Sequence, residues 1–489
     1  MRTQRLFVLL FSAGLWLVGC TTAPTASEND QLTATPAASA PSEPPNIILI
    51  VADDLGYGDL GSYGQQQIQT PALDRMASEG MRFTQFYAGS TVCAPSRSVL
   101  MTGQDTGHTR VRGNASGETL KQSLRPEDIT LAEVAQQADY RTALIGKWGL
   151  GEINDPGFPM EQGFDQFFGY LNQVHAHNYY PEFLWRNRDT VRLANEVQRS
   201  DKVYSTFVGG YATKKVDYSH DLFMEEAVAF VEENQQDRFF LCLTLTIPHA
   251  NNEAGRQGME ISQQNTSSYE QYADEDWPEA QKKGAAMISH LDSDVGRLLS
   301  ALQDYGIDEN TLVLFTSDNG PHQEGGYDPD FFDANGPLRG IKRDLYEGGI
   351  RVPLIARWPG HVPAGTTSDH ISYFGDMMAT FADLMDVPAP DSLQSTSMVP
   401  TLLGNPDEQR LHNYLYWEFY EQGSRQAVRM GNWKAIREPM FTGPVELYNL
   451  ETDLGEENNV GEENPEVVTE AARIMERAHQ SSPEWVVSQ

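Results

Sequence analysis

The chain has 489 residues, enough for one large α/β domain with a smaller appended one, and its 39% hydrophobic residues can fill a sizeable core. Its 35 Lys and Arg residues against 69 Asp and Glu residues give a formal net charge of −34. This excess of acid argues against nucleic acid as a partner, because phosphate binding needs clustered Lys and Arg. Three cysteines are too few for a disulfide scaffold or a cysteine-rich zinc site: Cys20, Cys93 and Cys242.

The N-terminal segment predicts an export signal. Arg2 and Arg5 precede an apolar run that is too short for a membrane-spanning helix. Small residues directly before Cys20 resemble a bacterial lipobox, although an ordinary signal with an incidental cysteine would share these features. The resemblance implies that residues 1–19 are a lipoprotein signal peptide and that Cys20 is lipidated. We therefore expect an exported protein, lipid-anchored at the periplasmic or outer-membrane face of a bacterium, with a Thr/Ser/Ala/Pro-rich tether over residues 20–45.

The next part of the chain alternates buried strands with helices. Continuous apolar runs predict strands buried on both faces of a sheet, and they cover residues 46–52, 142–145, 239–245 and 312–316. Thr70 and Pro71 supply the N-cap and first residue of a helix, and apolar side chains between residues 291 and 302 share one helical face. This alternation predicts a large doubly wound, mostly parallel sheet flanked by helices, which we expect to form the main domain over residues 46–400.

The pattern changes toward the C-terminus. Short segments separated by turns predict a small antiparallel sheet, and they cover residues 414–419, 427–430, 433–436 and 446–449. A final helix is predicted over residues 465–479. We therefore expect a smaller C-terminal α+β subdomain over residues 401–489.

Polar side chains follow four of the predicted strands. They are Asp53 and Asp54, Lys147, His249, and Asp318 with Asn319. Ligands of open α/β sheets bind beyond the carboxyl ends of the strands, so we expect these side chains to meet there. The aspartates and the asparagine offer only hard oxygen ligands, which favours Ca²⁺, with Mg²⁺ as second choice and Zn²⁺ as a poor one. Asp318-Asn319-Gly320 would also suit a simple tight turn.

The pentapeptide Cys93-Ala94-Pro95-Ser96-Arg97 is the strongest motif, although a cysteine alone is more often a small buried apolar residue. With it, the chain resembles the formylglycine-dependent sulfatases (arylsulfatase-like members of the alkaline phosphatase superfamily), and in particular bacterial polysaccharide sulfatases. The resemblance covers nearly all of residues 46–460 and makes residues 46–400 the sulfatase catalytic domain. It rests further on Asp53-Asp54, Thr102-Gly103, Gly146-Lys147-Trp148, Pro248-His249, Ser317-Asp318-Asn319-Gly320, Leu338-Arg339-Gly340-Ile341-Lys342, Glu347-Gly348-Gly349 and Leu447-Tyr448-Asn449-Leu450.

The resemblance implies a mechanism for hydrolysis of sulfate esters. A separate formylglycine-generating maturation enzyme would oxidise Cys93 to 3-oxoalanine, and one hydroxyl of the hydrated aldehyde would attack sulfur while the other drives release of sulfate. The modified Cys93 and the four oxygen-bearing residues would bind calcium. Arg97 would hold the formylglycine hydroxyl. Lys147, His249 and Lys342 would bind sulfate oxygens, and His249 or Lys342 would protonate the leaving oxygen.

One position departs from the family pattern. The family commonly has a histidine as the base that follows Gly-Lys-Trp, whereas this chain has Gly149, which cannot accept a proton. His108, His175 and His177 are the candidates for that role and for binding the substrate, and the sequence does not choose between them.

The substrate is predicted less sharply. Residues 172–187 mix aromatic side chains with polar donors, which suits sugar rings, although the same mix suits a packed loop. The expected partner is a sulfated saccharide, with galactose or N-acetylgalactosamine sulfate as the guess for the sugar. Two alternatives remain: a phosphonate or phosphate ester hydrolase of the same superfamily, and a catalytically degenerate surface glycan-binding lipoprotein.

Overall fold

The structure is a computed structural model that describes residues 43–114, 122–203, 208–391 and 393–486. The predicted signal peptide, Cys20 and nearly all of the predicted tether lie outside the described residues, so their assignment stays a prediction. The described residues all belong to one unit, residues 37–489, and the division at residue 400 also stays a prediction. Within the described part of the chain, every helix is too short or too polar to cross a bilayer.

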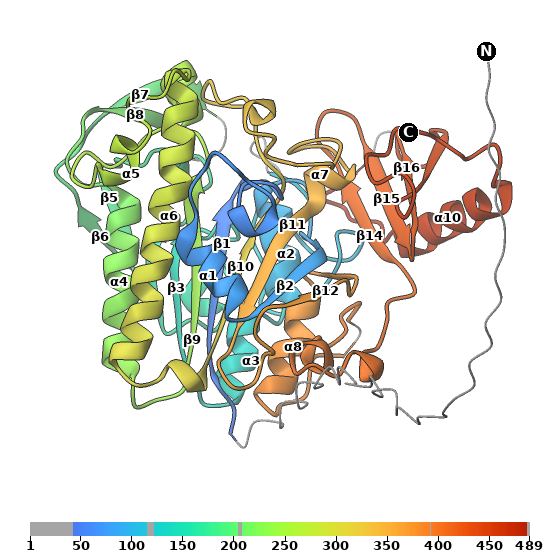
Figure 1. The fold of residues 1–489 in the computed structure, drawn as a ribbon, viewed down its shortest axis with the longest axis horizontal. Coiled ribbons are helices and arrows are strands. Elements are labelled where there is room, and N and C mark those ends of the chain that lie inside the picture. Colours follow the sequence, from blue (N-terminus) through green and yellow to red (C-terminus); the bar gives the residue numbers. More distant parts are fainter. Residues whose placement is uncertain (1–42, 115–121, 204–207, 392, 487–489) are drawn as a thin grey trace, which may run out of the picture. The chain divides into compact units, whose positions relative to one another are not determined.

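A mixed sheet of eleven strands organises the main part of the chain (Figure 1). Its order is β12–β2–β11–β10–β1–β9–β3–β4–β5–β6, with β13 paired to β2. The strands are β1 (Asn46–Asp53), β2 (Met81–Tyr87), β3 (Arg141–Lys147), β4 (Gln166–Tyr170), β5 (Phe183–Arg186), β6 (Asp189–Arg192), β9 (Phe239–Pro248), β10 (Thr311–Ser317), β11 (Arg351–Arg357), β12 (Thr366–Ser368) and β13 (Ser372–Tyr373).

The centre of this sheet is parallel. β10, β1, β9, β3 and β4 pair in parallel, whereas β11, β2, β5 and β6 join the sheet through antiparallel pairs. In β1, Ile47, Leu49 and Val51 enter one core, and Ile48 and Ile50 enter the other. Both faces are therefore covered, which explains the continuous apolar run in the sequence. The predicted fold class, a large mostly parallel sheet with helices, is confirmed.

Helices cover both faces of the sheet. α1 (Pro71–Ser78), α4 (Ser219–Asn234) and α6 (Glu279–Asp304) contribute to one core, and α4 and α6 lie side by side (Figure 1). The other core receives α2 (Cys93–Thr102), α3 (Leu131–Gln137) and α8 (Asp376–Leu384). Shorter α-helices are α5 (Ser267–Glu270), α7 (Glu347–Ile350) and α9 (Val399–Leu402), and a separate hairpin pairs β7 (Glu196–Val203) with β8 (Val208–Lys214).

A second, four-stranded antiparallel sheet lies toward the C-terminus (Figure 1). Its strands are β14 (Leu415–Phe419), β15 (Arg425–Met430), β16 (Trp433–Arg437) and β17 (Val445–Asn449), followed by α10 (Pro465–Ala478). The helix packs its apolar side chains on this sheet in a small core of its own. The predicted antiparallel sheet is confirmed.

Candidate active site

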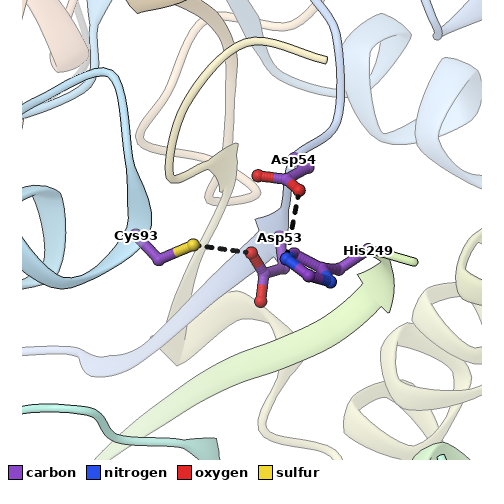
Figure 2. Close-up of side chains that lie close together, drawn as sticks. All are labelled: Asp53, Asp54, Cys93 and His249. Carbon is purple, nitrogen blue, oxygen red and sulfur yellow. Dashed lines mark hydrogen bonds and ion pairs between the residues drawn. The ribbon is translucent and has the colours of Figure 1, made fainter. Parts of the chain in front are cut away.

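The carboxyl ends of neighbouring parallel strands bring the predicted polar residues together. β1 ends at Asp53, β3 at Lys147, and His249 follows β9 directly. Asp54 has a left-handed backbone, with φ 66°, which interrupts the alternation of side chains along the strand. Both aspartates therefore reach one centre, where ligand atoms of Asp53, Asp54, Cys93 and His249 all lie within 4.8 Å of one another (Figure 2).

Four oxygen-bearing side chains of this centre are buried: Asp53, Asp54, Asp318 and Asn319. The Asn319 amide donates to Asp54 Oδ1 over 2.7 Å, and the Asp54 backbone N–H donates to Asp318 Oδ1 over 3.1 Å. Asn319 Oδ1 is buried without a hydrogen-bond partner among the described residues. Buried polar atoms are rarely left unpaired, so an unpaired oxygen beside three carboxylates fits a hard cation such as Ca²⁺.

Three buried cations face the three carboxylates. Lys147 Nζ lies 2.6 Å from Asp53 Oδ2, and Lys342 Nζ lies 2.8 Å from Asp54 Oδ2. Arg97 donates to Asp318 Oδ2 from Nε and Nη2, over 3.1 and 2.9 Å, and from Nη1 to the Lys147 carbonyl. These groups leave the centre close to neutral, so a divalent cation would make it positive enough to attract an anionic substrate.

The electrostatics of the carboxylates follow these pairs. Burial alone would raise the pKa of Asp53, but Lys147 and its other cationic neighbours hold that pKa well below its usual range. Burial and the charge of Asp53 raise the pKa of Asp318 above its usual range, and its contact with Arg97 opposes this rise.

Cys93 lies beside this centre as the first residue of α2. Its Sγ atom is 3.4 Å from Asp53 Oδ1 (Figure 2), and its side chain is almost fully buried. Burial and the charge of Asp53 raise the pKa of the thiol. The N-terminus of a helix carries a partial positive charge, which favours an anionic ligand at this position.

His249 and Lys342 form a hydrogen-bonded pair. His249 Nδ1 donates to the Ala250 carbonyl over 2.6 Å, so Nε2 carries the lone pair and accepts from Lys342 Nζ over 3.1 Å. Burial and the neighbouring Lys342 lower the pKa of His249 to about 3. The imidazole is therefore neutral, and the proton of the pair resides on Lys342.

A cavity of about 1240 Å³ opens over this centre. Four residues of the cluster described above line this cavity: Cys93, Lys147, His249 and Lys342. Its other walls carry polar and aromatic side chains, including His177, Gln173, Arg256, Arg343 and Trp485.

The three histidines proposed as alternative bases lie in different parts of the structure, and one of them lines the cavity. His177 lines the cavity, stacks on His249 with ring centroids 4.9 Å apart and lies 3.1 Å from Glu253 Oε2. His175 packs between Tyr170 and Phe183, and His108 pairs with Asp105; neither is among the described residues that line the cavity.

Sequence reasoning missed Glu324. Its carboxylate lies 2.8 Å from Arg343, 3.7 Å from Lys342 Nζ and 4.0 Å from His249 Nε2. Burial would raise its pKa, but Lys342 and the other neighbouring cationic groups lower it. A single glutamate in a polar loop carries no sequence signal that would have identified this contact.

Gly149 faces Gln173 at the position where a family histidine is expected. Gly149 has φ 78°, and a Cβ atom added to it would lie only 1.8 Å from Gln173 Nε2. The Gln173 amide is buried without a hydrogen-bond partner among the described residues, and Gln173 lines the cavity. The two positions therefore act as a unit in which the glycine makes room for the amide.

We expect Gly149→Ala to destabilise the fold through two separable effects. The left-handed backbone costs alanine about 1–2 kcal/mol, and the clash with Gln173 adds to this cost. Urea unfolding of Gly149→Ala with and without Gln173→Ala measures the second effect, which we expect at about 1 kcal/mol or more.

Gly306→Ala is the matched control for that experiment. Gly306 has φ 71°, and nothing lies within 4 Å of its added Cβ atom, so it reports the backbone cost alone. Equal losses for Gly149→Ala and Gly306→Ala would contradict a steric role for Gln173.

Comparisons with known proteins agree with this geometry. Residues 45–387 match the Sulfatase family, and residues 341–481 match the C-terminal family of N-sulphoglucosamine sulphohydrolase. The chain is 32% identical to N-acetylgalactosamine-6-sulfatase of Canis lupus familiaris over 417 residues, which are 82% of this chain and 72% of that protein. It is 32% identical to arylsulfatase A of Homo sapiens over 429 residues, covering 83% of this chain and 77% of that protein.

A solved structure shares the fold along nearly the whole chain. The crystal structure of Ps i-CgsB in complex with k-i-k-neocarrahexaose has a TM-score of 0.75 and 28% sequence identity, covering 91% of this chain and 95% of that one. The family match covers well over half of the residues, and it includes Asp53 at the end of β1, Asp54 directly after it, and the cysteine that begins α2. The chain belongs to the sulfatase family and is a sulfuric ester hydrolase.

Proposed function

We propose that this sulfatase removes sulfate from a sulfated saccharide, using a formylglycine made from Cys93 and a calcium ion bound beside it. The observation that carries the proposal is the position of Cys93, which lines the cavity and lies 3.4 Å from Asp53 in a group of buried carboxylates and cations. A relative named N-acetylgalactosamine-6-sulfatase and a similar structure containing a neocarrahexaose support a saccharide as the substrate.

Asp53, Asp54, Asp318 and Asn319 would hold the calcium ion, because their oxygens are buried together and Asn319 Oδ1 is unpaired among the described residues. When bound, the ion would polarise the sulfate group and favour the ionised nucleophile. A separate maturation enzyme would convert Cys93 to formylglycine, whose hydrate supplies the attacking hydroxyl.

The cations of the chain would bind and orient the sulfate group. Lys147 and Lys342 line the cavity and each pairs with one of the two aspartates, so their ammonium groups can face the sulfate oxygens. Arg97 is buried behind them on Asp318 and Asp53, where it fixes the carboxylates. Lys342 would donate a proton from Nζ to the leaving oxygen, and His249 Nε2 would position that ammonium group.

The saccharide itself would occupy the wide part of the cavity. His177 stacks on His249 at the cavity wall and offers an edge to a sugar hydroxyl, while Arg256 and Trp485 supply a charge and an aromatic face. Galactose or N-acetylgalactosamine sulfate remains our proposal for the sugar. Export and lipid anchoring through Cys20 would place the enzyme where extracellular polysaccharide is met.

The test is release of sulfate by protein produced with a formylglycine-generating enzyme. We expect sulfate release from nitrophenyl sulfate and from a sulfated galactan or N-acetylgalactosamine 6-sulfate. Faster turnover of a nitrophenyl phosphonate ester would instead identify a phosphonate hydrolase. Binding of the sulfated saccharide by fully modified protein without release of sulfate would identify a glycan-binding protein.

Replacement of Lys342 by glutamine should have an effect that depends on the leaving group. A general acid contributes most when the leaving oxygen is strongly basic, by about 10²–10⁴-fold, and little for nitrophenolate. We therefore expect the kcat of Lys342→Gln to fall more steeply along a series of aryl sulfates, from nitrophenyl to phenyl, than the kcat of the enzyme without this substitution.

Lys147→Gln is the matched control, because it removes a buried ammonium group that pairs with Asp53, whereas His249 accepts its hydrogen bond from Lys342. We expect it to lower kcat by a similar factor along the whole series. Since the slope of the series does not depend on the amount of active enzyme, parallel slopes for the two variants would contradict proton donation by Lys342.

A further inference from the structure

A second cluster of metal-ligating side chains lies between α4 and α6, among residues that the catalytic proposal does not use. His220 is near the start of α4, and His290 and Asp294 lie one turn apart on α6. One ligand atom of each lies within 4.8 Å of the others, and all three side chains are buried. None of the three is among the described residues that line the catalytic cavity.

The three side chains converge at short distances, yet several of their polar atoms lack a well-aligned hydrogen bond. His220 Nε2 lies 3.1 Å from Asp294 Oδ2, and His290 Nε2 lies 3.4 Å from the same oxygen. Nevertheless, both ring nitrogens of His220 and Asp294 Oδ2 lack a hydrogen-bond partner among the described residues, and His220 is fully buried. Polar atoms that lie close together without aligned hydrogen bonds are expected when each of them is directed at a position between them, such as the site of an ion.

Neighbouring side chains fix the positions of the Asp294 and Asp221 carboxylates. Arg297 Nη2 lies 3.0 Å from Asp294 Oδ1, which leaves Oδ2 for the cluster. Asp221 lies next to His290, with Oδ1 3.1 Å from His290 Nε2, while Ser262 donates to its Oδ2 over 2.6 Å. Outer contacts of this kind orient the ligands of protein metal sites.

We propose that His220, His290 and Asp294 bind one zinc ion, with a water molecule as the fourth ligand and Asp221 beside His290 as an outer partner. Tetrahedral zinc with bonds of about 2.0–2.1 Å separates its ligand atoms by roughly 3.3 Å, which is close to the separations of 3.1 and 3.4 Å. Two imidazoles with a carboxylate favour zinc over calcium, which prefers oxygen ligands alone. The Asp221 side chain is 23% exposed and gives the ion a route from solvent. The ion would tie α4 to α6 and would take no part in sulfate chemistry.

Zinc binding can be measured directly on the full chain. Protein freed of metal is first saturated with Ca²⁺, to occupy the catalytic centre, and then dialysed against ZnCl₂ in excess Ca²⁺. We expect about one equivalent of zinc to remain by mass spectrometry of the metal, and a melting temperature several degrees higher. Cobalt in place of zinc should give the strong visible absorption of a four-coordinate ion. A chain that retains no zinc under these conditions overturns the proposal.

Variants locate the ion. His220→Gln should lose the bound zinc, and Asp221→Asn, which changes a partly exposed side chain, should weaken its binding at least tenfold. His412→Gln is the matched control, because His412 pairs with Asp376 over 2.9 Å but belongs to none of the metal-ligating groups found among the described residues. If His220→Gln fails to fold, Asp221→Asn decides. If the variants that fold bind zinc as tightly as the chain without substitutions, the proposal is overturned. Aryl sulfate turnover should be unchanged in Asp221→Asn.

Discussion

Cys93→Ala should abolish sulfate ester turnover, with a loss in kcat/KM of at least about 10⁴-fold, because the variant has no precursor for a covalent nucleophile. The fold should remain, since within the described parts of the chain Sγ makes one hydrogen-bond-length contact, to Asp53, and its removal should change the free energy of unfolding by about 1 kcal/mol. The measurement is aryl sulfate hydrolysis by protein produced with a maturation enzyme, alongside mass spectrometry of the peptide that contains residue 93.

Cys242→Ala provides the matched control for the loss of a buried thiol. Cys242 is fully buried in the middle of β9, within the apolar core, and does not line the cavity. We expect this variant to keep its activity and to lose a small amount of stability. Retained turnover in Cys93→Ala, or an unmodified Cys93 in fully active protein, would contradict a formylglycine mechanism.

The sequence was most informative about the parallel centre of the fold. Runs such as residues 239–245 are buried on both faces, so their composition alone identifies a central strand. Once these strands are parallel neighbours, the residues that follow them must meet, which places Asp53, His249 and Asp318 together. The site could be predicted to that extent because its side chains follow the strands directly.

Features that depend on long-range packing could not be predicted in this way. β2 mixes buried and half-buried side chains, so it lacks the continuous apolar run that marks the central strands. Gln173 is opposite Gly149 because β4 and the turn after it pack beside β3, and no local pattern connects the two residues. The same holds for His220 and Asp294, which come from separate helices of the fold.

Asp318 accepts three hydrogen bonds that a substitution would break at once. Its Oδ2 atom accepts two hydrogen bonds from Arg97, and Oδ1 accepts from the Asp54 backbone. In Asp318→Asn, three buried cations would face two carboxylates, and an amide nitrogen would compete with Arg97 for position. Removing one partner of a buried ion pair costs roughly 3–5 kcal/mol, so we expect a loss of stability of that order before any metal is considered.

The same substitution should weaken calcium binding and turnover together. Loss of a charged oxygen ligand should raise the calcium concentration needed for half-maximal activity by about 10²-fold or more, and excess calcium should restore part of the rate. Activity is measured against free calcium in chelator-buffered solutions, with unfolding followed in parallel. Asp308→Asn serves as the control, because Asp308 pairs with Arg357 over 2.6 Å away from the cavity and should lose stability without a change in calcium dependence. An unchanged calcium midpoint in Asp318→Asn would mean that this carboxylate positions Arg97 without binding the ion.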